Sequence, residues 1–425
     1  MISLNLRGKR ALKVATAGIA SAYLLLGTAA FAEPLTLSAA MSRAANADPA
    51  ARATQQRLVA ADANIRQAGF RPNPSIGLEA ENILGSAPYN GLSQAETTLS
   101  YQQPLERKSK REARVGVASA GRDLVVAQGR ARAWAIMNDA QDLWIEAAAA
   151  DAEVTVARER LALAQTSQSE ITRRVDAARD PLFAGSLANA DVASAQIALD
   201  QAIANAAQVK LQLATLWGGA PDFDILPAWF EDLSAIKIDN ALVDTPDLEV
   251  LRAEQRVASA QIRVETTRRT QDPTLSAGVR HYQGDGAFAF VVGGSIPIGR
   301  FDNNQGNIDR SRADAEAAAT DIEVAERIRI REISASTIKL SNYAREVRRI
   351  DEEVIPIAER AVTQVREGFG RGGFTYRDVI GAQETLVAAK ARRVEVLKQF
   401  HTELAKRDRL SGRWVALLPE QAPNS

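Results

Sequence analysis

Four short segments of the chain alternate apolar and polar residues, which is the pattern of β-strands. They cover about 74–82, 96–103, 273–282 and 287–296. In the third segment, for example, Leu275, Ala277 and Val279 alternate with small or polar residues. Each segment has about nine residues, close to what a tilted strand needs to cross the bilayer core. We therefore predict two transmembrane strand hairpins, with a small soluble hairpin packed on helices as the alternative.

Two much longer segments, about 108–178 and 304–368, carry apolar residues at alternating steps of three and four, which is typical of coiled-coil helices. The first seam, in which only Gln168 is polar, consists of Ile136, Ala140, Leu143, Ala147, Ala150, Val154, Ala157, Leu161, Ala164, Gln168, Ile171 and Val175. The second, in which Ser336 is the exception, consists of Ile333, Ser336, Leu340, Tyr343, Val347, Ile350, Val354, Ile357 and Ala361. Roughly seventy helical residues make a rod of about 100 Å, for which a globular domain has no use.

The chain consists of two halves that contain the same motifs in the same order. The motif Ala-x-Ala-x-Ile-Arg begins at Ala61 and again at Ala258, and Asp-Val-x-x-Ala-Gln begins at Asp191 and again at Asp378. Landmarks in the same order indicate a duplicated unit. We predict a first repeat over 33–217, a connector over 218–245, a second repeat over 246–411 and a C-terminal tail over 412–425.

Each repeat is predicted to open with a short helix and to close with a return helix. The short helices begin at Pro49 and Pro246, where a missing N–H is tolerated. The return helices run from about 187 to 217 and from about 375 to 410, each after a turn. Each half is therefore a helical hairpin below a strand hairpin.

The first 32 residues have the features of a secretory signal peptide. Four basic residues come first, a largely apolar stretch follows, and Ala30-Phe31-Ala32 is a small-x-small cleavage site before Glu33. No cysteine follows that site, and no 18-residue apolar run occurs after it. We expect cleavage between Ala32 and Glu33, and export.

The amino-acid composition argues against several classes of function. The chain has 52 basic and 52 acidic residues, which argues against a nucleic-acid binder. It has no cysteine, which excludes disulfides and cysteine-ligated metals, and its two histidines are too few for a histidine-cluster site. No nucleophile–base pair is evident, so we predict no enzyme, no cofactor and no metal site. Removal of the signal peptide leaves 48 basic against 52 acidic residues, a mildly acidic chain.

Four transmembrane strands cannot close on themselves, and an open edge in lipid leaves backbone groups unpaired. The strands must therefore be completed by other copies of the chain. Three copies supply twelve strands, an ordinary even number for a barrel. We predict a mainly α-helical protein whose coiled-coil hairpins form a periplasmic tube, joined to a trimeric 12-stranded outer-membrane barrel.

The order of these elements resembles the TolC-like outer-membrane efflux family over essentially the whole mature chain. The matching features are the hairpin ends near Pro104 and Pro297, the repeated Asp-Val-x-x-Ala-Gln motif, and the stretch Gln67-Ala68-Gly69-x-Arg71-Pro72-Asn73-Pro74. That stretch is similar to the branch serving cobalt–zinc–cadmium resistance pumps. The resemblance implies a homotrimeric outer-membrane conduit that contacts lipid, docked to a periplasmic adaptor and an inner-membrane proton-driven pump of the RND type.

The resemblance also implies that the helix tips form the adaptor-contacting, aperture-closing end. The corresponding residues are Asp180, Leu182, Gly185, Ser186, Leu187, Gly370, Gly372, Gly373 and Phe374. Asp191 and Asp378 have two open interpretations: they ring the tunnel mouth, or they cap the return helices. The first tip has one glycine against four in the second, so equal roles are not expected.

Three other signals favour structural interpretations. Gly368-x-Gly370-x-x-Gly373 matches a dinucleotide fingerprint, but it follows a predicted helix where that motif must follow a strand. His401 lies in register with apolar residues and suits a packed or bore-facing position. His281 suits a membrane-interface position on its strand. The leading hypothesis is a conduit for divalent metal cations; the alternatives are a conduit for drugs, organic solutes or polypeptides, and a periplasmic coiled-coil tether without a pore.

Overall fold

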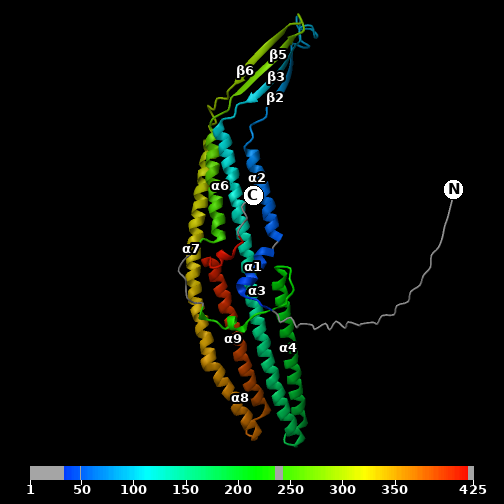
Figure 1. Cartoon of the computed structure of the whole chain (residues 1–425), viewed down its shortest axis with the longest axis vertical. Helices are drawn as coiled ribbons and strands as arrows, with labels where there is room; N and C mark the ends of the chain where they lie inside the picture. Colours follow the sequence, from blue (N-terminus) through cyan, green and yellow to red (C-terminus); the bar gives the residue numbers. More distant parts are fainter. Residues whose placement is uncertain (1–32, 48, 235–242, 420–425) are drawn as a thin grey trace, which may run out of the picture.

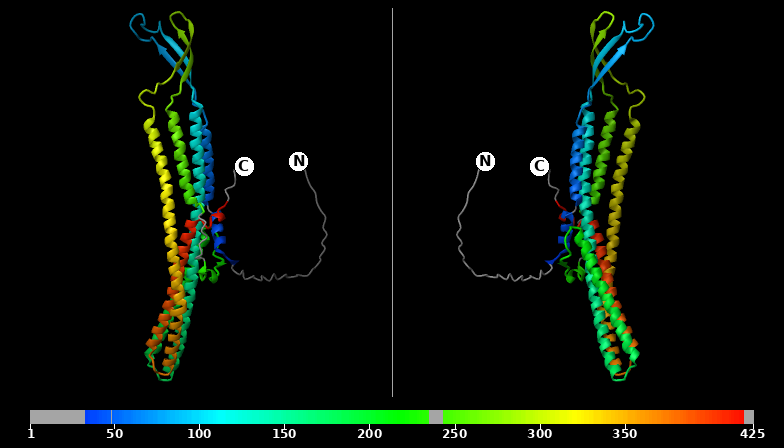
Figure 2. Two further views of the ribbon diagram at one scale, coloured as in Figure 1. Left: turned by 90° about the vertical axis from the view of Figure 1, so that its left-hand side faces the viewer. Right: turned by 90° about the vertical axis from the view of Figure 1, so that its right-hand side faces the viewer.

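The computed structural model describes residues 33–47, 49–234 and 243–419. The expected signal peptide, including Ala32, lies outside the described residues, and Glu33 is the first residue inside them. The molecule is elongated, with a strand sheet at one end and the tips of helices at the other (Figures 1 and 2).

The sheet contains four antiparallel strands in the order β2-β3-β5-β6. Their bounds are β2 (Ser75–Glu81), β3 (Glu96–Pro104), β5 (Thr274–Tyr282) and β6 (Phe288–Ser295). The register places one apolar residue of each strand in a single row across one face: Leu78, Leu99, Val279 and Phe290. These side chains are 74%, 55%, 39% and 90% exposed. An apolar face left this open in one chain requires lipid or another partner to cover it.

The helical part is organised around two long elements. These are α3 (Lys108–Asp176) in the first half and, in the second, α7 (Gln305–Arg349), a π-helical turn (Ile350–Val354) and α8 (Ile355–Gly370). Helices α2 (Pro49–Ala68) and α4 (Leu182–Thr215) pack along α3. Helix α6 (Pro246–Arg268) packs along α7, and α9 (Tyr376–Ser411) packs along both α7 and α8. Because α3 also packs against α6 and α9, it joins the two halves.

The second predicted seam is wrong beyond Ile350. Val354 and Ile357 are 44% and 58% exposed, whereas Ala358 and Val362 are buried. The π-helical turn inserts one extra residue, so every later apolar position moves by one. Pro356 lies two residues after this turn; it has no N–H to donate and its ring crowds the carbonyl four residues earlier.

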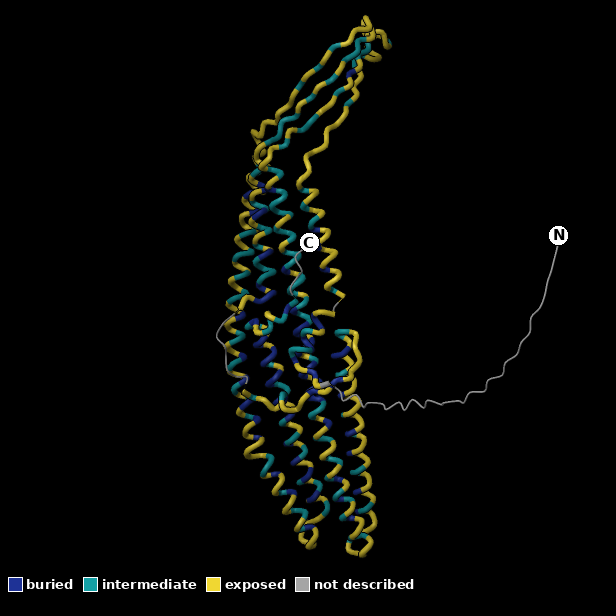
Figure 3. The backbone as a smooth tube through the Cα atoms, in the orientation of Figure 1, coloured by how far each residue is buried: buried dark blue, intermediate teal, exposed yellow. Residues whose placement is uncertain are grey.

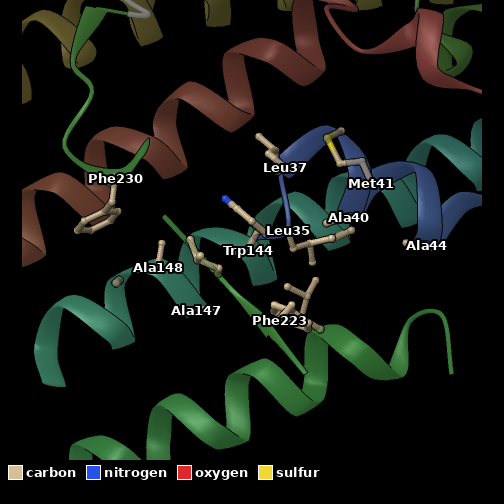
Figure 4. Close-up of a cluster of buried hydrophobic side chains, with 14 of the residues drawn as sticks. Leu35, Leu37, Ala40, Met41, Ala44, Trp144, Ala147, Ala148, Phe223 and Phe230 are labelled. Atoms are coloured by element: carbon tan, nitrogen blue, oxygen red, sulfur yellow. The ribbon is translucent and has the colours of Figure 1, made fainter. Parts of the chain in front are cut away.

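The core lies at the middle of the rod, where short elements cover α3 (Figure 3). These are β1 (Glu33–Pro34), α1 (Leu37–Ala47), β4 (Phe223–Asp224), α5 (Pro227–Phe230) and a 3-10 turn (Val415–Leu417). Strand β1 pairs in parallel with β4. Met41, Trp144 and Phe223 converge with alanines of α1 and α3 (Figure 4). These alanines are small, which lets the two helices approach closely.

None of the described helices combines the length and the apolar character that crossing a bilayer requires.

Candidate functional site

The first helix tip is a tight turn between α3 and α4. Helix α3 ends at Asp176, Ala178 takes a positive φ of 53°, and α4 begins at Leu182. The return helix was expected to begin only at about Leu187. It begins earlier because Pro181, with extended backbone angles, occupies the N-cap position and starts the helix directly after it. Gly185, Ser186 and Leu187 therefore lie in the first turns of α4.

The second tip is closed by glycines. At the end of α8 the Gly373 N–H donates to the Gly368 carbonyl and the Gly372 N–H to the Phe369 carbonyl, both at 2.9 Å. This is the Schellman arrangement of Gly368 to Gly373, which needs a positive φ at its last residue but one, and Gly372 supplies 83°. The glycines that match a dinucleotide fingerprint thus end a helix and follow no strand. The ring of Phe374 lies over Gly368, where a β-carbon would fall 2.2 Å from it.

The two tips of one chain are tied together by Arg174. Its guanidinium holds the Asp180 carboxylate within the first tip and donates from Nη1 to the Phe369 carbonyl of α8 at 2.7 Å. It also lies 4.3 Å from the centre of the Phe369 ring, within range of a cation–π contact. A second ion pair joins Arg366 of α8 to Glu170 of α3. A small apolar cluster adjoins these contacts. It includes Ile171, Ala184, Ala188, Phe369 and Val379.

The surface of the first tip is apolar and open. Leu182, Phe183 and Leu187 are all more than half exposed, and Leu182 reaches 82%. At the second tip Phe374 is exposed as well, beside Gly370 and Gly372. Sequence reasoning placed the tips but did not single out Phe183 or Arg174. The contact of Arg174 spans 195 residues of sequence, so no local pattern indicates it.

The two candidate mouth acids have different settings. Asp378 is part of a capping box at the start of α9: its carboxylate accepts from the Thr375 N–H at 2.8 Å, and the Thr375 hydroxyl accepts from the Asp378 N–H at 3.4 Å. The Thr375 hydroxyl also donates to the Asp378 carboxylate at 2.7 Å, and this bond, followed by the one from the Thr375 N–H, lowers the pKa of Asp378. Asp191 lies well inside α4, away from its cap, beside a cavity of about 250 Å³ between α3 and α9. Burial, followed by the negative charge of Asp191, raises the pKa of Tyr376 to about 12.

Neither histidine has the setting of a metal ligand. His401 is buried, its Nε2 lies 2.8 Å from the Phe230 carbonyl, and its ring stacks on Trp229 with centroids 4.4 Å apart. Burial lowers the pKa of His401. His281 lies on the apolar sheet face, 4.7 Å from the ring of Phe288. Over residues 33–47, 49–234 and 243–419, no three histidine or acidic side chains form a group that could hold a metal ion.

A polar cluster lies at the end of the sheet farthest from the helices. Arg280 of β5 forms ion pairs with Glu81 of β2 at 2.8 Å and with Glu96 of β3 at 2.9 Å. Its Nε donates to the Thr98 hydroxyl at 2.9 Å, and Asn82 donates to Glu96 at 2.8 Å. The register places Glu81 directly opposite Glu96, so Arg280 separates two like charges. This cluster lies on the polar face of the sheet and was not anticipated from the sequence.

An elongated chain with an exposed apolar sheet at one end and paired helix tips at the other has the fold of a TolC-like outer-membrane channel. A family model described as "Outer membrane efflux protein" matches residues 40–219 and 237–413. The cobalt-zinc-cadmium resistance protein CzcC of Cupriavidus metallidurans is 30% identical over 398 residues, 90% of this chain and 91% of that protein. The nickel and cobalt resistance protein CnrC of the same organism is 30% identical over 64% of this chain and 69% of that protein.

Solved structures agree on the fold. The outer-membrane protein VceC from Vibrio cholerae superposes with a TM-score of 0.66 at 20% identity, covering 88% of this chain and 96% of that one. CusC, a protein that forms a transmembrane channel, superposes with a TM-score of 0.71 at 15% identity, covering 92% of this chain and 95% of that one. The chain belongs to the outer membrane efflux protein family. Its place is the outer membrane, and the resemblance to the heavy-metal resistance branch is confirmed.

Proposed function

We propose that the protein is the channel of a tripartite RND-type efflux system, a passive conduit that carries divalent heavy-metal cations across the periplasm and outer membrane. The observation that carries this proposal is the separation of its two exposed apolar regions. The sheet face suits lipid at one end, and the tips suit a protein partner at the other, with a helical rod between them. Such a molecule spans two compartments and needs no bond chemistry, so we propose no enzymatic activity.

The sheet supports a homotrimer. Strands β2 and β6 are its edges, and each edge leaves unpaired backbone groups that cost several kcal/mol apiece in hydrocarbon. Pairing β2 of one copy with β6 of the next removes both edges, and three copies supply twelve strands. The helical hairpins of the three copies then surround one periplasmic tunnel.

The tips support docking to a periplasmic adaptor, which in turn meets the inner-membrane pump. Leu182, Phe183 and Leu187 present an exposed apolar surface at the far end of the rod. Because the chain has no cysteine, single-cysteine variants test this cleanly. A cross-linker on Leu182→Cys should capture the adaptor in cells, whereas Asp285→Cys, at the opposite end of the molecule, should not. Equal capture by both variants contradicts docking at the tips.

The cargo is proposed from the relatives and from charge. The names of CzcC and CnrC connect those proteins to resistance to cobalt, zinc, cadmium and nickel. The mature chain carries 48 basic against 52 acidic residues, a balance that suits cation passage. A conduit need not bind its cargo tightly, so the absence of a metal-binding group in the described residues is compatible with this role.

A deletion strain tests the cargo. Loss of the protein should lower tolerance to zinc, cobalt and cadmium and leave tolerance to a panel of antibiotics and solvents unchanged, and the wild-type gene should restore it. The opposite pattern assigns the same conduit to drugs or organic solutes. Loss of a secreted polypeptide from the medium assigns it to protein export. A tether without a pore predicts no defect in either tolerance.

A further inference from the structure

The polar face of the sheet ends in a cluster whose charges are arranged unevenly. On that face β2 contributes Glu79 and Glu81, β3 contributes Glu96, and β5 contributes Arg280 as the one cation among them. The chain enters β2 from α2 at Ser75 and reaches Glu81 last, so the cluster lies at the end of the sheet farthest from the helices (Figure 1). If the proposed channel holds, this end is its outer exit.

The cluster faces the bore. Arg280, Glu81 and Glu96 lie on the face opposite the row of exposed apolar side chains that contains Leu99. In a closed ring of strands the apolar face meets lipid, so the opposite face lines the water-filled lumen. Exported cations therefore pass these carboxylates on their way out.

Glu81 and Glu96 would form a cation-binding pair if Arg280 were absent. Residues directly opposite each other on antiparallel strands have β-carbons about 5 Å apart, so their two carboxylates reach one ion between them. Carboxylate oxygens are good ligands for divalent metals. Arg280 fills this position with its own guanidinium, which forms an ion pair with Glu81 through Nη2 and donates hydrogen bonds from Nη1 to Glu96 and from Nε to Thr98.

We propose that Arg280 is a specificity-determining residue of the exit: it occupies the Glu81–Glu96 pair and so prevents divalent cargo from binding there and obstructing the pore. Arg280 is suited to this role because a guanidinium is always charged and presents its donors in a fixed fork. The inference rests on the proposed channel function and adds a residue that keeps the exit of that channel free of bound cations.

The test is zinc block of single channels in planar bilayers, with zinc added on the side of the strands. Potassium current through wild-type channels should tolerate zinc. Arg280→Gln channels should be blocked at zinc concentrations at least roughly tenfold lower than those that block the wild type, because the positive charge that would repel the zinc ion is gone. Arg280→Lys, which keeps the charge, should resemble the wild type. The double variant Arg280→Gln with Glu81→Gln should lose the block, since half of the carboxylate pair is removed.

The outcomes separate the two proposals. Equal zinc sensitivity of Arg280→Gln and wild type overturns the role of Arg280, as does a block by zinc that the double variant retains. If Arg280 only braced the sheet, the Gln and Lys variants would both lower thermal stability and leave zinc sensitivity unchanged. Absence of any current through wild-type protein instead refutes the channel. Arg280→Met, which keeps the aliphatic stem, replaces the Gln variant if the latter does not insert, with the same expected block.

Discussion

The contact of Arg174 with Phe369 predicts how firmly the two hairpins of one chain are held together at the tip. Arg174→Gln removes the bond from the guanidinium to the Phe369 carbonyl and the cation–π contact with its ring. A hydrogen bond from a charged group contributes ~1.5–3 kcal/mol, and a partly exposed cation–π contact ~0.5–1 kcal/mol. The Arg174 side chain is 18% exposed, so we take ~2 kcal/mol for the sum, which is roughly a thirtyfold change in the balance between joined and separated tips.

Single-channel conductance measures that balance. Channels of Arg174→Gln should spend far more time in high-conductance states than wild-type channels. Arg173→Gln is the matched control, because Arg173 is the neighbouring residue and, within the described part of the chain, donates to Ser169 of its own helix alone. Asp180→Asn should give a smaller change, since it leaves the contacts with Phe369 in place. Identical conductance records for the Arg174 and Arg173 variants would refute the proposed tie between the tips.

Three further predictions concern the core and the helix ends. Trp144→Ala should destabilise the protein by ~3–5 kcal/mol, because a side chain that is 1% exposed leaves a large cavity, and Trp144→Phe should cost clearly less; similar denaturant midpoints for both contradict this packing. Burial lowers the pKa of His401 below its ordinary 6.5, so its contribution to stability is present above that value and is lost as pH falls toward the folded-state pKa. Lowering the pH from about 7.5 to about 5.5 should therefore reduce the thermal midpoint less in His401→Gln than in wild type. Equal reductions in the two proteins contradict this role. Thr375→Ala should remove ~1 kcal/mol of capping and speed amide hydrogen exchange in the first turn of α9; unchanged exchange there contradicts the capping box.

Elements that depend on local periodicity were predictable. The strand alternation and the first coiled-coil seam reflect side-chain spacing within one element, and every residue of that seam is buried or half-buried in the structure. The second seam was predictable only up to Ile350. A single π-helical turn shifts all later positions by one residue, and counting heptads along the sequence does not reveal such an insertion.

Contacts between distant segments were not predictable. The short helix α1 and the parallel pairing of β1 with β4 arise because both segments find the same apolar surface on α3. The tie between Arg174 and Phe369 and the clamp of Arg280 on Glu96 join residues 195 and 184 positions apart. In each case the sequence contains many equivalent arginines, and only the packing of helices and strands selects the one that meets a partner.

The trimeric channel is tested most directly by the mass of the particle extracted from membranes. The unpaired edges of β2 and β6 and the exposed apolar sheet face require lipid and neighbouring copies. Native mass spectrometry should therefore find three copies of the mature chain, released only by detergent. A monomer or dimer recovered in buffer without detergent contradicts the channel and favours a periplasmic tether.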